Sequence, residues 1–240
     1  MRPFDSLGRA AASTGRVAAV AALALLAGAA DAVSLSPVLV EVTPARPVQT
    51  ITMANPGDRP MRFQVQVLAW SQRNGVEVRT PSNDLIVAPA IADIPAGGRQ
   101  IFRIASRTPP SGAQRAYRLV FEDIGDAPTP TGEVAVALRV NHDLPIFVSP
   151  PSLEPAALQV EACGTPAPGC VRVHNTGGRY GVVRALRAEG SEAQQTVNTR
   201  VLAGSWREWQ LAVKPGAAPT RIRVVTDVGG PDVVAGSAGR

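Results

Sequence analysis

The side chains that could carry chemistry in this chain are few, and their spacing does not build a catalytic site. Neither of its two histidines, His142 and His174, has a Cys, a second His or a carboxylate at the spacing of a metal site. Glu122 and Asp123 are adjacent carboxylates, but neighbours on a strand point to opposite faces and cannot share acid–base work. No Gly-x-Ser-x-Gly motif and no phosphate-binding glycine-rich loop are present. We therefore predict that the protein is not an enzyme and holds no cofactor and no metal.

Cys163 and Cys170 are the only cysteines, and they flank the loop-forming segment Gly-Thr-Pro-Ala-Pro-Gly. In an exported protein such a pair is typical of a disulfide that closes a hairpin, whereas redox-active pairs are usually Cys-x-x-Cys at a helix start. We predict a structural disulfide between Cys163 and Cys170. Because the loop is short, the bond is expected to contribute about 2 kcal/mol to stability.

Four aliphatic residues alternate with smaller or polar ones in the segment between Glu133 and Asn141. Val134, Val136, Leu138 and Val140 therefore project from one face of an extended strand. Such a strand can complete the core of its own domain, or it can be lent to the core of another protein. Periodicity alone favours the first alternative.

The first 32 residues have the pattern of an export signal. Arg2, Arg9 and Arg16 form a positive head, the apolar run Val17–Ala27 follows, and Ala30-Asp-Ala32 supplies the small residues of a cleavage site. The apolar run is too short to span a bilayer, and no later segment is continuously apolar for the required length. We expect residues 1–32 to be a cleavable signal peptide and the mature chain to be periplasmic, without stable membrane insertion.

The formal net charge of +5 includes the three signal arginines. Elsewhere the arginines are scattered, with no basic run and no interleaved aromatic residues, so nucleic acid is not an expected partner.

After the signal, short strand-like runs separated by Gly, Pro, Asn and Asp replace helical periodicity. In the first part we expect strands over Ser34–Val42, Val48–Ala54, Arg62–Ser71, Leu85–Val87, Ala90–Ile94, Gln100–Ser106, Ala116–Asp123 and Val134–Val140. In the second part we expect them over Ala157–Ala162, Val171–Asn175, Val182–Ala188, Arg200–Leu202, Trp206–Val213 and Arg221–Asp227. Pro145 is expected to end regular pairing, and Pro150 and Pro151 to form a stiff connector. We predict an all-β protein of two immunoglobulin-like β-sandwich domains, residues 33–148 and 152–240, joined by a short Pro-containing elbow.

Several segments, taken in order, resemble the periplasmic chaperones of the chaperone–usher pathway, the PapD-like family. They are Val33–Val40, the turn at Asn55 leading to Trp70, Leu85–Ile104, Tyr117–Ile124, Val134–Pro150, Val171–Asn175, Leu202–Gly204 and Thr226–Gly230. Ser-Pro-Val near the start and Leu-Pro-Ile-Phe-Val near residue 148 look most like the archaic, or sigma-type, branch. The resemblance implies two immunoglobulin-like domains set at an angle like a boomerang, with a client pilus subunit held in and along the cleft.

In that family the last strand of the first domain completes a subunit that lacks one strand, a known case of strand addition. The resemblance therefore implies that Val134, Val136, Leu138 and Val140 are the donor-strand residues that bind the subunit. It implies pilus subunits and an outer-membrane usher as partners, and it leaves open self-association of the free protein.

Two features of the family are missing here. The Arg and Lys that anchor the subunit's terminal carboxylate correspond to Leu39 and Pro145, so we expect another cation, Arg103 or Arg118, to take that role. In the interdomain charge cluster Asp123 and Asp227 match, but Ser149 replaces the Arg. Two acids without that Arg would repel, so hydrophobic contacts around residues 146–148 are a candidate for holding the elbow.

The alternative hypothesis is an exported tandem immunoglobulin-like binding module for a surface glycan or a folded protein. Such a module would carry aromatic residues at loop tips. Trp206 and Trp209 are the closest aromatic pair, but their strand-like spacing indicates packing rather than sugar stacking.

Overall fold

The computed structural model describes residues 32–108, 110–125, 139–163, 169–189, 192, 194–211, 221–228 and 233–236, and within them the chain is all-β. The first ten strands are β1 (Ser34–Ser36), β2 (Val40–Val42), β3 (Val48–Ala54), β4 (Met61–Arg73), β5 (Val76–Pro81), β6 (Leu85–Ala88), β7 (Ile91–Ile94), β8 (Arg99–Ser106), β9 (Arg115–Asp123) and β10 (His142–Val148). They are followed by β11 (Leu158–Ala162), β12 (Cys170–Asn175), β13 (Gly181–Ala188), β14 (Gln194–Val201), β15 (Trp206–Gln210), β16 (Arg221–Thr226) and β17 (Val233–Gly236).

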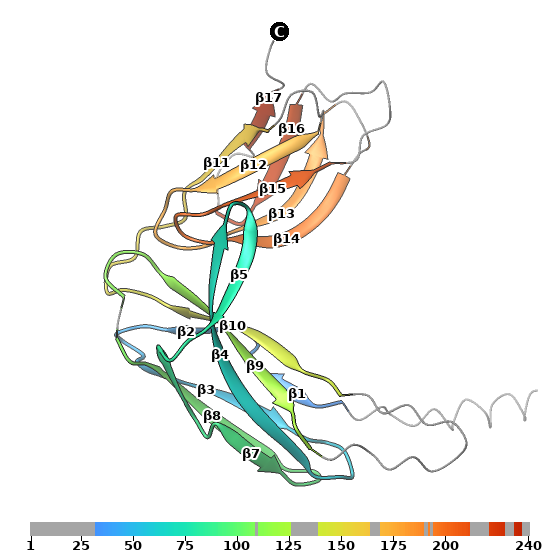
Figure 1. Cartoon of the computed structure of the whole chain (residues 1–240). Coiled ribbons are helices and arrows are strands. Elements are labelled where there is room, and N and C mark those ends of the chain that lie inside the picture. The colour runs from blue at the N-terminus through green and yellow to red at the C-terminus, as the bar shows by residue number, and fades with distance from the viewer. Residues whose placement is uncertain are drawn as a thin grey trace, which may run out of the picture.

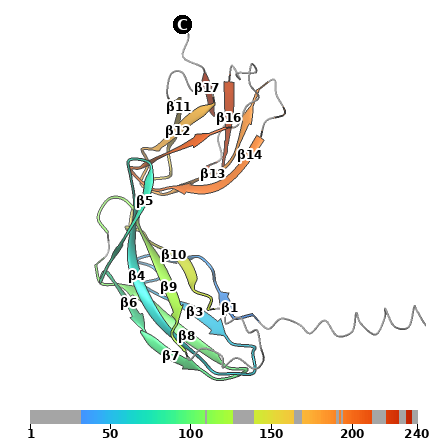
Figure 2. The ribbon, with the colours of Figure 1, turned by 45° about the vertical axis from the view of Figure 1, so that its right-hand side comes forward.

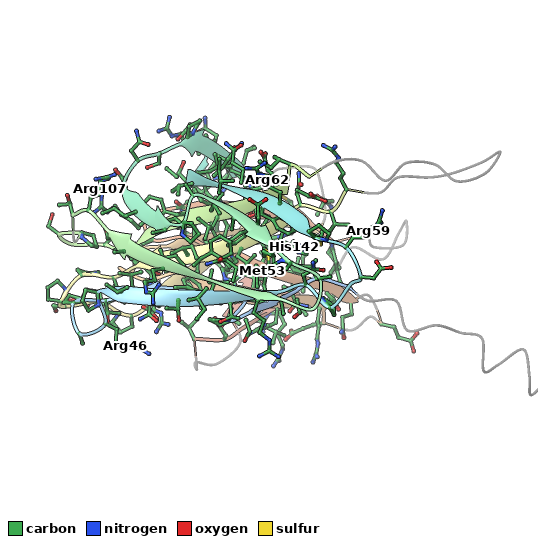
Figure 3. All side chains as sticks on the ribbon, turned by 90° about the horizontal axis from the view of Figure 1, so that it is seen from below. Arg46, Met53, Arg59, Arg62, Arg107 and His142 are labelled. Carbon is green, nitrogen blue, oxygen red and sulfur yellow. A yellow bond between two sulfur atoms is a disulfide. The ribbon has the colours of Figure 1, made fainter. Side chains whose placement is uncertain are left out.

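The first ten strands form one β-sandwich. One sheet has the order β1-β3-β8-β6, and the other has the order β2-β10-β9-β4-β5, with β7 paired to β4. Alternate residues of the facing strands fill the space between the sheets, as strand geometry requires. The largest fully buried side chains of this core include Phe63, Phe102, Tyr117, Leu119 and Phe121. In Figure 3, which looks along the molecule from this domain, Met53 lies within the sandwich, while Arg46, Arg59 and Arg107 lie at its rim.

The last seven strands form a second, smaller sandwich with sheets β11-β12-β15 and β14-β13-β16-β17. Its own core contains Val171, Val173, Val183, Leu186 and Val224. The two sandwiches are set at an angle to each other, and the β4–β5 hairpin reaches from the first to the second (Figure 1 and Figure 2). The prediction of two immunoglobulin-like β-sandwiches is confirmed. No helix in the described ranges is long and apolar enough to cross a membrane.

The strand that leads to the second domain differs from its prediction. Pairing does not end at Pro145, because β10 runs from His142 to Val148 and pairs with β9 throughout. Pro145 precedes the stretch where β2 joins, so it lies at an edge position, where a missing N–H is tolerated. The strand predicted over Val134–Val140 lies largely outside the described residues, and its last residue, Val140, is not in a strand.

Other differences occur where local patterns were short. The run Ser34–Val42 is two strands rather than one, because the chain turns at Pro37 between β1 and β2. Strands β5 and β17 were not predicted, and β14 extends well before Arg200. Strand β5 is short and nearly all exposed, and its Val-Glu-Val-Arg-Thr-Pro sequence contains only two aliphatic residues, too few for a clear strand pattern.

Candidate functional site

Half of β10 has an unpaired edge. Antiparallel pairing with β9 covers the whole strand, but parallel pairing with β2 covers only Ile146–Val148. In the described parts of the chain no strand pairs with the other side of residues 142–145, so their outward backbone groups are free to accept another strand. Of the residues in β10, Leu144, Ile146 and Val148 are buried in the core of their own domain.

Val140 has the same parity as these core residues but lies beyond the core, with 58% of its surface exposed. The strand itself begins at His142, and the spacing in the sequence places Val140 in line with the apolar face formed by Leu144, Ile146 and Val148. The other predicted donor residues, Val134, Val136 and Leu138, lie outside the described residues, so their role stays a prediction.

His142 marks the place where this face leaves the core. Its imidazole is half-buried, and its ring centroid lies 6.3 Å from that of Phe63. Burial disfavours the charged form and lowers the pKa of His142 below its usual value of 6.5. Because its imidazole favours the neutral form, His142 extends the apolar face of β10 rather than interrupting it with a charge.

On the opposite face of β10, Asp143 is held by two arginines. Its Oδ1 accepts a hydrogen bond from Arg118 Nε at 2.7 Å, and its Oδ2 accepts one from Arg79 Nη1 at 2.6 Å. Arg118 lies directly across from Pro145 in the β9–β10 register and is stacked 4.9 Å above the Trp70 ring. Its side chain is only 15% exposed. A second acid, Glu77, also lies 3.7 Å from Arg79.

Aromatic rings form the floor of the junction between the two domains. Phe147 stacks on Tyr180 with 4.2 Å between centroids and lies 6.1 Å from Trp70, and Leu202 completes the cluster. The guanidinium of Arg200 lies over this floor, 5.3 Å from the Tyr180 centroid and 5.9 Å from that of Phe147. The contact expected around residues 146–148 is thus made by the fully buried ring of Phe147.

Two buried glutamine side chains connect the domains through backbone groups. Gln72 Nε2 donates to the Arg200 carbonyl at 2.8 Å, and Gln72 Oε1 accepts from Leu202 N at 3.0 Å. Gln114 Oε1 accepts from Tyr180 N at 3.3 Å, and the Gln114 backbone N donates to the Gly178 carbonyl at 2.8 Å. Both glutamines are at least nine-tenths buried.

Glu41 adds a charged contact to this junction. Its carboxylate accepts from Ser149 Oγ at 2.6 Å and from Gln114 Nε2 at 3.2 Å, and it lies 3.5 Å from Arg179 of the second domain. Ser149, which stands where the family has an Arg, therefore bonds an acid of the first domain instead of bridging two acids.

The tip of the β4–β5 hairpin closes the junction from the other side. Gly75 lies so close to Trp206 that an added Cβ would meet the indole ring at 2.5 Å. Nearby, Arg207 of β15 lies 3.3 Å from Glu77 of β5. Trp206 is therefore an interdomain contact, and Trp209 packs against the core of the second domain. Neither is at a loop tip, as a sugar-binding module would require.

The structure separates the two predicted carboxylate anchors. Arg118 lies beside the junction, whereas Arg103 is exposed on β8, in the other sheet of the first domain. The predicted interdomain acids bond within their own domains. Asp123, at the far end of β9, accepts from Gly125 N at 3.0 Å, and Asp227 accepts from Val182 N at 2.7 Å.

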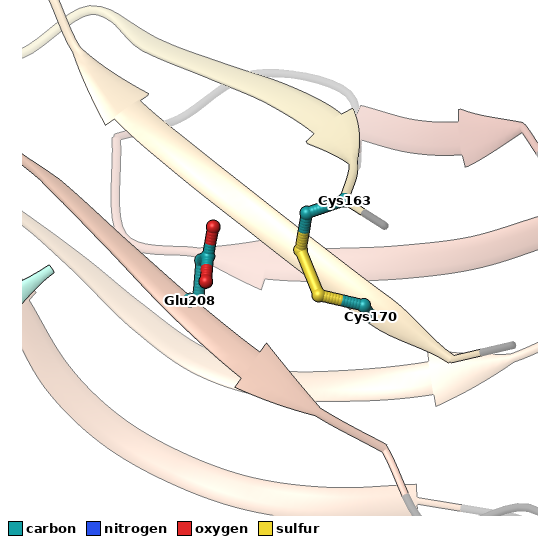
Figure 4. Close-up of side chains that lie close together, drawn as sticks. All are labelled: Cys163, Cys170 and Glu208. Carbon is teal, nitrogen blue, oxygen red and sulfur yellow. A yellow bond between two sulfur atoms is a disulfide. The ribbon is translucent and has the colours of Figure 1, made fainter. Parts of the chain in front are cut away.

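Cys163 and Cys170 form the predicted disulfide, which joins the segment after β11 to the start of β12. Glu208 lies beside the two sulfur atoms (Figure 4). This group does not form a metal site, because disulfide sulfurs are not thiolates and Glu208 already accepts a hydrogen bond from Arg172 Nε at 2.6 Å.

Sequence reasoning indicated the region of Phe147, through the contacts expected around residues 146–148, but missed the other residues that build the junction, namely Gln72, Gln114, Tyr180 and Arg200. The one available indication was that Gln72 and Trp70, two residues apart, lie on the polar face of β4. A strand whose polar face is exposed to water would show the same spacing. Their roles depend on a neighbouring domain that no local pattern specifies.

Comparison with protein families gives one match over this region. The model described as "Pili and flagellar-assembly chaperone, PapD N-terminal domain" matches residues 32–154. No curated protein matches the chain by sequence.

Solved structures with a similar fold include three chaperones. One is in the CsuC–CsuE chaperone–tip adhesion subunit pre-assembly complex from archaic chaperone–usher Csu pili of Acinetobacter baumannii. It matches with a TM-score of 0.62 at 16% sequence identity, covering 85% of this chain and 96% of that chain. The Salmonella enterica SafA pilin in complex with the SafB chaperone matches with a TM-score of 0.61 at 17% sequence identity, covering 86% of this chain and 95% of that chain. The E. coli chaperone DraB matches with a TM-score of 0.58 at 21% sequence identity, covering 86% of this chain and 96% of that chain. At these identities the likeness is one of fold.

Proposed function

Because the chain belongs to the pili and flagellar-assembly chaperone family, we propose that it is a periplasmic chaperone that binds pilus subunits, stabilises them and delivers them to an outer-membrane usher. The family is one of assembly chaperones and not of enzymes. Two of the similar structures are complexes with a pilin or a tip subunit, which supports pilus subunits as the clients. Residues 1–32 are the cleavable signal that exports the chain.

The mechanism we propose is donor-strand complementation. The client lacks one strand of its sandwich, and the segment leading into β10 supplies it, with Val134, Val136, Leu138 and Val140 entering the client's core. The observation that carries this proposal is the unpaired edge of residues 142–145, together with an apolar face that continues past the domain's own core to the exposed Val140.

The energy available is adequate for a complex that must later be released. Burying four branched aliphatic side chains contributes roughly 6–12 kcal/mol, at about 1.5–3 kcal/mol each. Association and the ordering of the strand remove a large part of that gain. Main-chain hydrogen bonds along the edge supply affinity that does not depend on the client's sequence, and the apolar side chains fix the register.

Of the two predicted carboxylate anchors, Arg118 is favoured over Arg103. It lies opposite Pro145, the position that corresponds to the family's Lys, and beside the domain junction. Its guanidinium is already bonded to Asp143, so a client carboxylate at this place would have to share or displace that partner.

The proposal is tested by co-expressing the mature chain with a pilin-like subunit encoded beside it and measuring how much subunit is recovered in soluble form. We expect Val136→Asp and Leu138→Asp to abolish the gain in solubility, because each places a charge in the client's core. The control is Ile101→Asp, which changes an exposed aliphatic residue in the other sheet of the first domain. Equal recovery of subunit with wild type and with both donor-strand variants refutes the mechanism.

A further inference from the structure

Arg200 lies at the junction and has no acidic partner within the described parts of the chain. Arg79 and Arg118 bond Asp143, Arg179 pairs with Glu41, and Arg207 pairs with Glu77. The side chain of Arg200 is half-buried, and its Nε is buried without any hydrogen-bond acceptor. A partly buried cation with an unsatisfied Nε and no counter-charge gains from binding an anion.

The position of Arg200 is fixed from both domains. Its own carbonyl accepts the hydrogen bond from Gln72 of the first domain, and its guanidinium rests on the rings of Tyr180 and Phe147. Contact with aromatic faces stabilises a guanidinium without neutralising it. The charge is therefore held in place before any ligand arrives, which lowers the entropy cost of binding.

Arg200 and Arg118 lie at opposite ends of one aromatic pair. Arg118 stacks on Trp70, Arg200 lies over Phe147, and the two rings are 6.1 Å apart between centroids. Arg118 is neutralised by Asp143 and Arg200 is not. Phe147 belongs to β10 itself, so the free charge stands beside the strand that follows the proposed donor segment.

We propose that Arg200, contributed by the second domain, receives the terminal carboxylate of the polypeptide that binds along β10. This rests on the proposed function and adds a positioning residue to it. A planar carboxylate matches the geometry of a guanidinium, and the apolar floor strengthens the charge-assisted hydrogen bonds. Because the sequence lacks the family's first-domain cations at Leu39 and Pro145, the client is then held by both domains rather than by the first alone.

The experiment compares two forms of one synthetic peptide, the last strand of a pilus subunit encoded beside this chain, made with a free terminal carboxylate and as the terminal amide. Binding of each form to the full mature chain is measured by titration calorimetry. We expect wild type to prefer the free acid about 10-fold, the effect of one charge-assisted hydrogen bond. Arg200→Gln should bring the ratio close to one, Arg200→Lys should retain part of it, and Arg103→Gln, the exposed control, should leave it unchanged.

The ratio of the two affinities separates anion binding from damage to the junction. Weaker binding of both peptide forms with the ratio preserved in Arg200→Gln overturns the proposal. Loss of the preference in Arg118→Gln but not in Arg200→Gln overturns it as well and assigns the carboxylate to Arg118. Binding of neither form to wild type contradicts the proposed function itself, a result distinct from these two.

Discussion

Gln72→Ala is predicted to uncouple the two domains. The side chain of Gln72 is 7% exposed and makes two hydrogen bonds across the junction, at 2.8 Å to the Arg200 carbonyl and at 3.0 Å from the Leu202 amide. Truncation leaves that carbonyl and that amide buried without partners, each costing roughly 1–3 kcal/mol. Allowing for partial relaxation and entry of water, we expect the interdomain contact to lose about 3 kcal/mol.

The assay is differential scanning calorimetry of the mature chain, combined with small-angle X-ray scattering. A loss of this size should split the unfolding of wild type into two separate transitions, because coupling between domains is what makes their unfolding cooperative. Scattering should show a broader range of interdomain angles. Gln72→Glu keeps the volume and the acceptor for Leu202 N but removes the donor to the Arg200 carbonyl, so it should still weaken the junction if the hydrogen bonds matter more than the volume.

The matched control is Gln66→Ala, on the same face of the same strand. Gln66 Nε2 donates to Glu122 Oε2 at 2.7 Å within the first domain, in a part-buried position, so its loss should cost about 1 kcal/mol or less and leave the interdomain angle unchanged. If Gln72→Ala has the unfolding profile and the scattering curve of Gln66→Ala, the reasoning about the junction is wrong.

Three further predictions concern single features of the fold. Gly75→Ala should weaken the interdomain contact more than Gly112→Ala in calorimetry, because both glycines have positive φ (75° and 91°) but only the first would drive a Cβ into an indole ring; equal losses would mean that backbone strain alone is responsible. His142 has a lowered pKa, so the unfolded chain binds its proton more readily and stability should fall as pH drops below 6.5; His142→Gln should flatten that part of the stability–pH curve, and an unchanged slope would contradict the assignment. Replacing Cys163 and Cys170 with Ser should lower the unfolding free energy of the second domain by about 2 kcal/mol in denaturant titrations while leaving it folded; a domain that no longer folds would show that the bond does more than close a short loop.

Strands with clean alternation and clear turns could be predicted from the sequence. In the sequence Arg62–Ser71 alternates between apolar and polar residues and the turn Asn74-Gly75 follows, so most of β4 (Met61–Arg73) and its turn could be predicted from local pattern. The prediction that pairing ends at Pro145 was wrong. Proline removes a backbone N–H, but that loss ends a strand only where the N–H would have bonded a neighbouring strand. The sequence shows Pro145 but not the position at which β2 starts to pair.

The interdomain site was harder to predict because its residues work through backbone groups and rings far away in sequence. Gln72 and Arg200 are joined by a hydrogen bond to a carbonyl, which every residue carries, so no side-chain pattern marks the partner. The family's charge cluster led instead to Asp123 and Asp227, which bond inside their own domains. The cysteine pair was predictable because a disulfide needs only two cysteines and an oxidising compartment.

The proposed donation of the segment before β10 restricts how this chain can change. Leu144, Ile146 and Val148 are buried in the core, so on the proposed mechanism the side of the strand that each donor residue presents depends on the number of residues separating it from them. Removing a single residue between positions 140 and 144 should present the wrong side of a donated strand to the client, whereas removing two should keep the same side and shorten the reach. New client preferences can therefore arise by substitution or by even-numbered changes of length, and odd-numbered ones should be lethal to assembly.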